Sequence, residues 1–197
     1  MAKGGMMKNK IIKKMCAAAV LACVSGPALA WAPYFSAGGS LGLGLGHDSA
    51  RGGGFSGAAG VRYKISDVNM RTEIEYSKRI YEKEYKYTTA DGEHHHDYDL
   101  NTDMYLLNVF VDPQMPLTHS GLHIGATAGA VTYRRDLPDF IDADDKTKTT
   151  FVYGASAGLG LHLLIGLHAD VGVRYLRTLD DDVMDSISPY INIRYGF

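Results

Sequence analysis

Two short motifs in this chain carry side chains that could hydrolyse a substrate. Glu73 and Glu75 stand two residues apart, and a pair of carboxyl groups can supply the acid and the nucleophile or base of a glycosidase. Residues 154–158, with Ser156 at their centre, match the G-x-S-x-G pattern, in which a strained turn presents a nucleophilic serine. Either chemistry requires particular neighbours and a particular local fold, so the elements that carry these residues decide between the interpretations.

A third motif is a run of histidines. His94, His95 and His96 precede Asp97 and Asp99, and imidazole groups beside carboxylates could bind Zn²⁺ or Cu²⁺. Consecutive histidines in a polar connection are poorly preorganised as metal ligands. We therefore predict a solvated outer loop and no bound metal.

The C-terminal residues 187–197 indicate which elements position these motifs. Apolar residues occupy every second position there: Ile187, Pro189, Ile191, Ile193, Tyr195 and Phe197. A period of two is typical of a β-strand with one apolar face. Such a face promotes aggregation in water, whereas a lipid bilayer favours it when the strands close into a barrel.

Seven earlier segments repeat this alternation. They span residues 35–45, 55–65, 70–77, 105–112, 122–130, 151–162 and 167–175. Helical periodicity is absent after residue 30, and the total of eight segments is the even number that bacterial barrels have. The sequence therefore predicts an all-β protein, an eight-stranded antiparallel up-and-down transmembrane β-barrel.

The connections between these segments alternate in length. Residues 66–69, 113–120 and 164–166 are brief, whereas residues 47–54, 82–99, 134–149 and 178–186 are polar and mostly longer. Short turns on one side of a membrane and long loops on the other produce this asymmetry. Aromatic residues near segment ends suit the two membrane interfaces: Trp31, Tyr34, Phe35, Tyr63, Tyr133, Phe151, Tyr153, Tyr175, Tyr195 and Phe197.

Residues 1–30 have the features of a cleaved signal peptide. Five lysines precede a short apolar stretch, and Ala28-Leu29-Ala30 forms a small-residue cleavage site. We therefore expect a barrel domain over residues 31–197, although Cys23 also offers a weaker lipidation site. Both cysteines lie in the leader, so a disulfide scaffold is not expected. Cleavage leaves 15 Lys and Arg against 22 Asp and Glu, an acidic balance that disfavours nucleic-acid binding.

The polar faces of the predicted strands carry many charges. A barrel of eight strands is only wide enough for its side chains to fill, and an unpaired buried ion costs several kcal/mol. We therefore predict an ion-pair network in the lumen, in which Glu73 and Glu75 pair with arginines instead of acting as a catalytic pair. Its expected members are Arg62, Arg71, Glu73, Glu75, Asp170, Arg174 and Arg194. Ser156 lies in mid-strand, where it adds a small inward side chain.

Several of these segments also resemble a known family. Residues 60–63, 69–76, 108–112, 173–175 and 194–197 are similar to strands of the opacity-type, OmpA–OmpX-like small outer-membrane β-barrels. The resemblance implies that Tyr195 and Phe197 form the signal read by the outer-membrane assembly machinery. It also implies a surface antigen, adhesin, complement-resistance factor or envelope-stabilising protein, and rarely an enzyme.

We therefore expect a non-enzymatic outer-membrane surface protein whose lumen is plugged by ion pairs. Its outer loops would mediate adhesion, host interaction or envelope integrity, with candidate contact residues Tyr85, Tyr87, His94, His95 and His96. The tyrosines could form a binding surface or extend the third strand beyond the membrane. Expected partners are lipid and lipopolysaccharide, the assembly machinery, and a host or envelope protein; we expect a monomer without cofactor. The alternatives are a lipid-modifying outer-membrane enzyme and a narrow ion channel.

Overall fold

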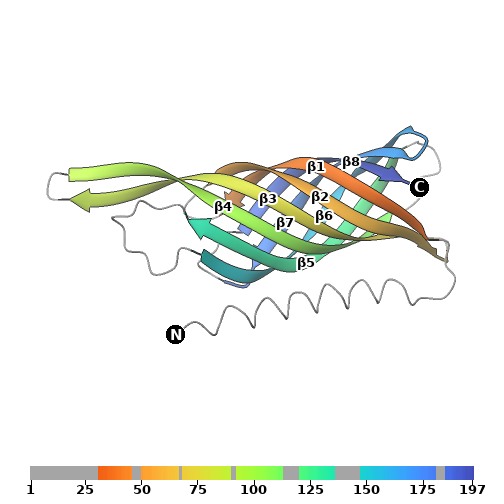
Figure 1. Ribbon diagram of the computed structural model, residues 1–197, viewed down its shortest axis with the longest axis horizontal. Helices are drawn as coiled ribbons and strands as arrows, with labels where there is room; N and C mark the ends of the chain where they lie inside the picture. The colour runs from red at the N-terminus through yellow and green to blue at the C-terminus, as the bar shows by residue number, and fades with distance from the viewer. Residues whose placement is uncertain are drawn as a thin grey trace. The chain divides into compact units, whose positions relative to one another are not determined.

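Eight strands form a closed antiparallel barrel (Figure 1). The computed structural model describes residues 31–45, 50–66, 68–89, 92–112, 120–135, 147–180 and 185–197. The strands are β1 (Ala32–Leu45), β2 (Arg51–Ile65), β3 (Val68–Thr89), β4 (Gly92–Asp112), β5 (Ser120–Arg135), β6 (Thr147–Leu164), β7 (Leu167–Thr178) and β8 (Asp185–Gly196). Each strand pairs with the next, and β1 pairs with β8. The predicted eight-stranded antiparallel barrel is confirmed; the predicted signal peptide, residues 1–30, lies outside the described residues.

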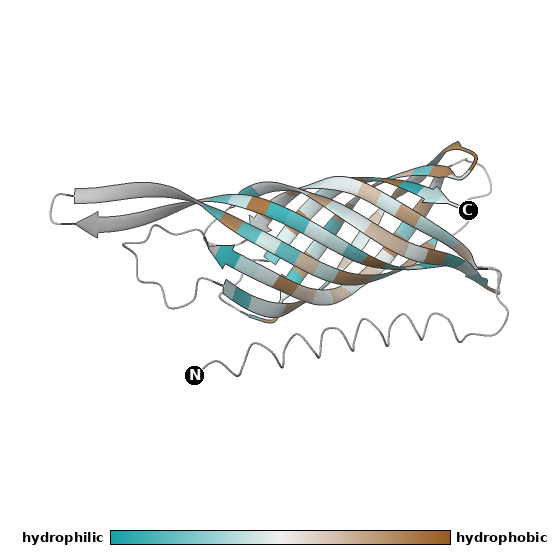
Figure 2. Ribbon diagram, in the orientation of Figure 1, coloured by the Kyte–Doolittle hydropathy of each residue, from teal (hydrophilic) through white to brown (hydrophobic). Residues whose placement is uncertain are grey.

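Where the structure describes their side chains, the strands alternate outward and inward residues, as the period of two requires, apart from an irregularity at residues 162–164. The outward face is strongly apolar: Phe35 is 59% exposed and Ile191 is 55% exposed. Figure 2 shows hydrophobic residues distributed around the barrel wall. A contiguous apolar surface of this kind is typical of contact with lipid and atypical of a soluble monomer. Among the described residues, no helix has the length and hydropathy needed to cross a membrane.

The two ends of the barrel differ. At the turn end, β2 passes to β3 through Ser66, whose φ is 54°, and β6 passes to β7 through Ile165 and Gly166, whose φ is 76°. Positive φ at these positions is what tight hairpin turns demand. The C-terminus lies at the same end (Figure 1), where the Phe197 N–H donates to the Pro33 carbonyl at 3.2 Å.

The opposite, hairpin end carries the longest strands. β2 pairs with β3 only as far as Glu82, and β5 pairs with β4 only as far as Leu100. β3 and β4 nevertheless continue to pair with each other up to Thr89 and Gly92, so their hairpin reaches past the other strands (Figure 1). The expected outer loop over residues 82–99 is therefore wrong for the backbone, which is strand on both sides of residues 90–91. The alternative expectation, that Tyr85 and Tyr87 extend the third strand, is confirmed for the backbone. Both faces of such an extension can be polar, so the apolar alternation that marks the membrane-embedded strands is missing.

The lumen is filled in two layers. Toward the hairpin end, an apolar layer packs Met104, Leu106, Val131, Val152 and Leu176 together. Tyr133 joins it and also contacts a smaller cluster of Ala50, Tyr81 and Leu100. Toward the turn end, the inward side chains are mostly charged or polar. Tyr34 and Tyr133, expected in an interfacial belt, instead belong to the lumen.

Candidate functional site

A buried Glu75–Arg174 pair lies near the middle of the lumen. Arg174 Nη1 and Nη2 donate to Glu75 Oε1 and Oε2, each at 2.8 Å, which is the bidentate geometry of a strong guanidinium–carboxylate pair. Each residue is only 3% exposed. β3 and β7 supply the two residues from different sides of the barrel. A charge buried this deeply is stabilised by its ion-pair partner, because water does not reach the site to solvate the charge if that partner is removed.

Asn108 of β4 joins the two glutamates. Its amide nitrogen donates to Glu73 Oε1 at 3.0 Å and to Glu75 Oε2 at 2.7 Å, and its amide oxygen accepts from Thr127 at 2.7 Å. The Tyr34 hydroxyl donates to Glu73 Oε2 at 2.8 Å. Glu73 is thus held by neutral donors among the described residues, whereas Glu75 has an arginine. The two carboxylates are buried on all sides and are occupied by protein donors, which leaves no face for a substrate.

A second ion-pair group lies nearer the turn end, around Asp170 of β7. Asp170 Oδ2 accepts from Arg71 Nη1 at 3.0 Å and from Arg194 Nε at 3.2 Å, and Oδ1 accepts from Arg194 Nη2 at 3.2 Å. Arg71 Nε also lies 2.7 Å from Asp112 Oδ2. Asp170 and both arginines are buried. One carboxylate is therefore shared by two guanidinium groups from β3 and β8.

Each arginine of these two groups also lies over an aromatic ring. Three such pairs occur at 4.6, 5.5 and 5.4 Å from the ring centroid: Arg71 over Phe110, Arg174 over Tyr190, and Arg194 over Tyr34. The ring face attracts the cation, most strongly where water is excluded. A glycine on a neighbouring strand makes room for each ring: Gly125 for Phe110, Gly172 for Tyr190, and Gly60 for Tyr34. The sequence feature that indicates space for these rings is the row of inward glycines.

A side chain in the space that one of these glycines leaves for a ring should destabilise the barrel. A Cβ atom on Gly60 would lie 2.7 Å from Tyr34 Cζ and 2.8 Å from Glu73 Cβ. We expect Gly60→Ala to lower the free energy of unfolding by about 1–3 kcal/mol, as for other overpacked cores. The measurement is the urea unfolding midpoint in detergent micelles.

Gly53 provides a matched control on the same strand, because a Cβ there meets nothing within 4 Å. Gly53→Ala should leave stability unchanged or raise it slightly, since alanine restricts the unfolded chain more than glycine does. If Gly60→Ala and Gly53→Ala change the free energy of unfolding equally, the packing of the lumen does not depend on the space that Gly60 leaves for Tyr34.

The structure departs from the predicted network at Glu73 and Arg62. Arg174 pairs with Glu75 as predicted, whereas Arg71 and Arg194 pair with Asp170 and not with a glutamate. Glu73 has no arginine partner among the described residues and is held by Asn108 and Tyr34, so its predicted ion pair is wrong. Arg62 makes no ion pair with any described residue. It lies at the turn end, opposite Arg71 in the β2–β3 register, two residues along β2 from the position that pairs with Glu73. Expecting it to pair with Glu73 or Glu75 was therefore wrong.

Sequence reasoning missed several members of the lumen. Arg79 is buried and donates to Ser188 Oγ at 2.7 Å, without an ion pair to any described residue. Its inward position follows from the alternation of Glu73, Glu75 and Ser77, continued past the predicted end of the segment. No sequence feature predicted that Asn108 bridges the two glutamates, because this contact depends on which residues of neighbouring strands lie at the same depth in the barrel.

The other chemical motifs do not assemble a site among the described residues. Ser156 lies in mid-β6, where no helix follows, so the strand–turn–helix context of a nucleophile elbow is absent from this strand. The nearby His123 Nε2 contacts the Tyr190 hydroxyl at 2.7 Å. Tyr85 is paired with His96 and Tyr87 with His94 in the β3–β4 backbone register. The side chains of this outer hairpin, and so the contact and metal predictions for it, lie outside what the structure describes.

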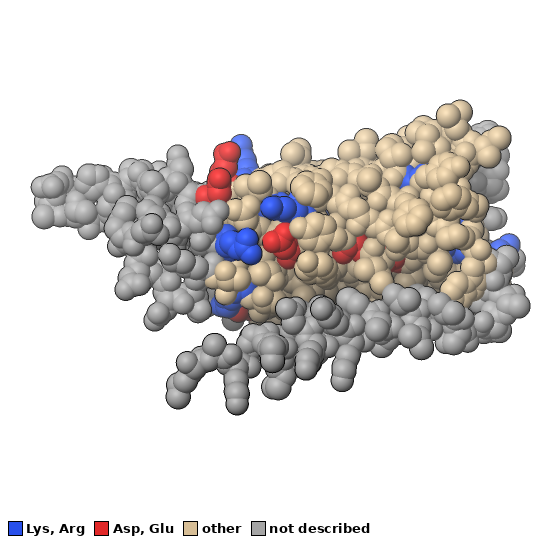
Figure 3. Space-filling view, viewed as in Figure 1, with Lys and Arg blue, Asp and Glu red and all other residues tan. Residues whose placement is uncertain are grey.

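Charges on the outer surface gather toward the hairpin end (Figure 3). There the Tyr76 hydroxyl donates to Asp103 at 2.7 Å and the Tyr175 hydroxyl donates to Asp185 at 2.9 Å. Tyrosines whose rings contact the apolar wall and whose hydroxyls meet carboxylates are suited to a membrane–water boundary. The wall between this rim and the turn end is predominantly apolar.

Comparisons with known proteins agree with this architecture. A family model described as "outer membrane protein beta-barrel domain" matches residues 16–195. Neisserial surface protein A has a similar solved structure, with a TM-score of 0.56 and 19% identity over 85% of this chain and 97% of that chain. OprG, an outer-membrane protein of Pseudomonas aeruginosa, gives a TM-score of 0.53 and 11% identity over 84% and 96%. At these identities the likeness supports the fold alone. No curated protein matches the sequence.

Proposed function

Because this chain belongs to the family of outer-membrane protein β-barrel domains, we propose that it is a non-enzymatic surface protein of the bacterial outer membrane. Its lumen is closed by ion pairs, and its β3–β4 hairpin contacts host surfaces or components of the cell envelope. The observation that carries the proposal is the extension of this hairpin past its neighbouring strands. In this family, short turns face the periplasm and long connections face outward, so the hairpin end is extracellular.

The proposal of a closed lumen rests on the two filled layers. The buried pairs of Arg174 with Glu75 and of Arg71 with Asp170 cross the lumen below the apolar cluster around Leu106 and Val131. Opening an aqueous path would require these ions to separate or the apolar layer to hydrate. Both changes cost free energy, so a passive channel is disfavoured.

The proposal that the protein is not an enzyme rests on the same geometry. The carboxylates of Glu73 and Glu75 are occupied by protein donors, and the Ser156 side chain is buried in the lumen. A lipid-modifying enzyme needs reactive groups that open toward the outer leaflet. Among the described residues, the outward side chains at the hairpin end offer tyrosines and ion pairs such as Lys148 with Asp180, without a serine–histidine–acid arrangement.

Contact through the hairpin is supported by its length. A strand crosses a bilayer in about 9–11 residues, and β3 and β4 have 22 and 21 residues. The excess pairs only within the hairpin over residues 83–89 and 92–99. A hairpin of two strands alone is marginally stable in water. No described strand pairs with β3 beyond Glu82 or with β4 beyond Leu100 on the outer edges of the hairpin, so a partner strand could add there.

Shortening the hairpin tests the proposal. Replacing residues 83–98 with Asn-Gly would join the paired residues Glu82 and Asp99 by a two-residue turn, which a hairpin accepts. We expect the shortened protein to lose most of its ability to make a non-adherent laboratory bacterium bind to cultured epithelial cells. Its barrel should remain folded, because the deleted residues contribute nothing to the closed part of the sheet.

Two controls make the result specific. Heat-modifiable migration in gels should be the same for the shortened and intact proteins, which shows that the barrel is assembled. A second variant shortens the β5–β6 connection at residues 137–145 and should retain binding. If the hairpin variant binds as well as the intact protein, the assigned contact region is incorrect.

A further inference from the structure

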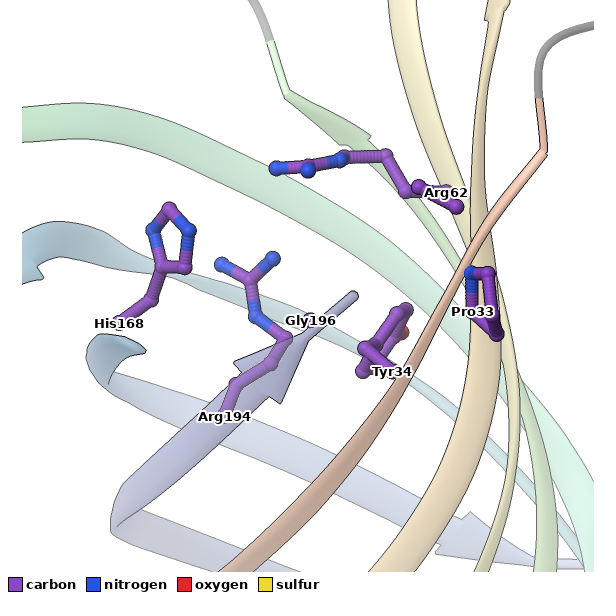
Figure 4. Close-up of a pocket in the computed structure, with 7 residues that line it drawn as sticks. Pro33, Tyr34, Arg62, His168, Arg194 and Gly196 are labelled. Atoms are coloured by element: carbon purple, nitrogen blue, oxygen red, sulfur yellow. The ribbon is translucent and has the colours of Figure 1, made fainter. Parts of the chain in front are cut away.

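A small cavity opens at the turn end of the barrel, outside the two ion-pair groups. Its polar lining comes from Tyr34, Arg62, His168 and Arg194, on strands β1, β2, β7 and β8. Figure 4 shows the Arg62 and Arg194 guanidinium groups and the His168 ring pointing into the same space. The cavity has room for one small group, not for a nucleotide or a sugar. In the membrane this end faces the periplasm.

The two arginines of this cavity differ in their partners. Arg194 uses Nε and Nη2 for Asp170, which also accepts from Arg71, and Arg71 Nε faces Asp112. Arg62 forms no ion pair with any described residue, including the Phe197 carboxylate. Within the described part of this end, Arg71 and Arg194 are therefore paired through Asp170 and Asp112, whereas the guanidinium group of Arg62 has no carboxylate partner.

The surroundings of the Arg62 guanidinium group favour binding of an anion over simple hydration. Arg194 is buried and lies over the Tyr34 ring, with its guanidinium 5.4 Å from the ring centroid. Arg62 is half-buried two strands away, on the other side of β1, and the His168 ring lies beside the two guanidinium groups (Figure 4). Convergent donors in a partly enclosed site bind anions more strongly than the same donors do in water. Their positions are set by four neighbouring strands, so little ordering is required.

We propose that this periplasmic mouth is a binding site for one carboxylate group. Arg62 and Arg194 supply the guanidinium donors, and His168 supplies a third polar contact. The planar donor fork of arginine matches a carboxylate. The carboxylate comes either from a small organic acid or from the end of a peptide chain, and the site would then couple the barrel to a periplasmic ligand.

The test is an NMR titration of the full mature barrel in zwitterionic micelles, at constant ionic strength maintained with sodium sulfate. Sodium acetate and N-acetyl-alanyl-alanine represent the two carboxylate sources, and N-acetyl-alanyl-alanine amide and sodium chloride are the comparison probes. We expect saturable shifts of the Arg62 and Arg194 Nε–H signals with acetate, with the free-acid peptide, or with both. The peptide amide should give no saturable shift. Saturation by the peptide assigns a chain end as the source, and saturation by acetate alone assigns a small acid.

Two variants on β2 separate a site from general attraction. Arg62→Gln should weaken carboxylate binding by about tenfold or more, as expected when a charge-assisted hydrogen bond is lost. Lys64→Gln removes the same charge from the same strand, outside the cavity lining, and should preserve binding. Heat-modifiable migration confirms that both variants fold. Shifts that never saturate, equal weakening by the two variants, or chloride binding as tight as acetate would each overturn the proposal.

Discussion

Replacing Arg174 with methionine is expected to lower the free energy of unfolding by about 3–5 kcal/mol, the usual cost of removing one partner of a buried ion pair. Arg174 donates to both oxygens of Glu75 at 2.8 Å. Its loss leaves Glu75 with the Asn108 amide as its remaining described donor. Because the site is buried, water does not take the place of the lost guanidinium group. Reversible urea unfolding in detergent micelles measures the change.

A double variant distinguishes the cost of leaving the Glu75 carboxylate unpaired from the cost of lost side-chain packing. Glu75→Leu combined with Arg174→Met removes both ions, so it should be more stable than Arg174→Met alone. Arg177→Met is the matched control, because Arg177 is an outward arginine on the same strand with a 58% exposed side chain. That substitution should change stability by about 0.5 kcal/mol or less. If the double variant is less stable than the single one, the destabilisation does not arise from an unpaired carboxylate.

Deleting Phe197 is expected to reduce the amount of assembled barrel in the outer membrane several-fold. Phe197 ends the strand that closes the barrel, and its N–H donates to the Pro33 carbonyl across the β1–β8 seam at 3.2 Å. Its ring meets those of Phe35 and Tyr195 edge to face, at centroid distances of 6.2 and 5.2 Å. We propose that Tyr195 and Phe197 together form the assembly signal. Quantifying heat-modifiable protein in membrane fractions measures the loss.

Phe35→Ala distinguishes a recognition signal from local packing. This substitution removes the ring that contacts Phe197 but leaves the C-terminal residue in place. We expect Phe35→Ala to assemble close to normal levels, because the terminal aromatic remains available. Equal losses for Phe35→Ala and for the deletion would assign the effect to the aromatic contact at the seam and not to a terminal signal.

The barrel could be predicted from the sequence because one physical constraint acts on every strand. Lipid outside and packed side chains inside require a period of two, so the inward positions of Glu75, Arg174 and Arg194 could be assigned without coordinates. Which arginine pairs with which carboxylate could not be predicted in this way. Glu75 and Arg174 are far apart in sequence, and they meet because strand tilt and stagger bring them to one depth. The same stagger puts Arg62 at the mouth, away from both glutamates.

Two further features lacked a sequence signal. The outer half of the β3–β4 hairpin is polar, and without an apolar face to mark it the segment resembles a loop. The apolar layer around Leu106, Val131 and Leu176 was hidden because inward positions of a membrane barrel are expected to be polar. These residues collect near the hairpin end, where they complement the charged layer below.

The central claim is that the lumen is closed, so that the protein acts through its outer surface. Single-channel recording in planar lipid bilayers tests this claim most directly, with a general porin inserted into the same membrane as the positive control. The ion pairs and the apolar layer predict no steady conductance above baseline for the purified, heat-modifiable protein. Reproducible opening steps from the wild-type barrel would contradict the closed lumen and favour a narrow ion channel.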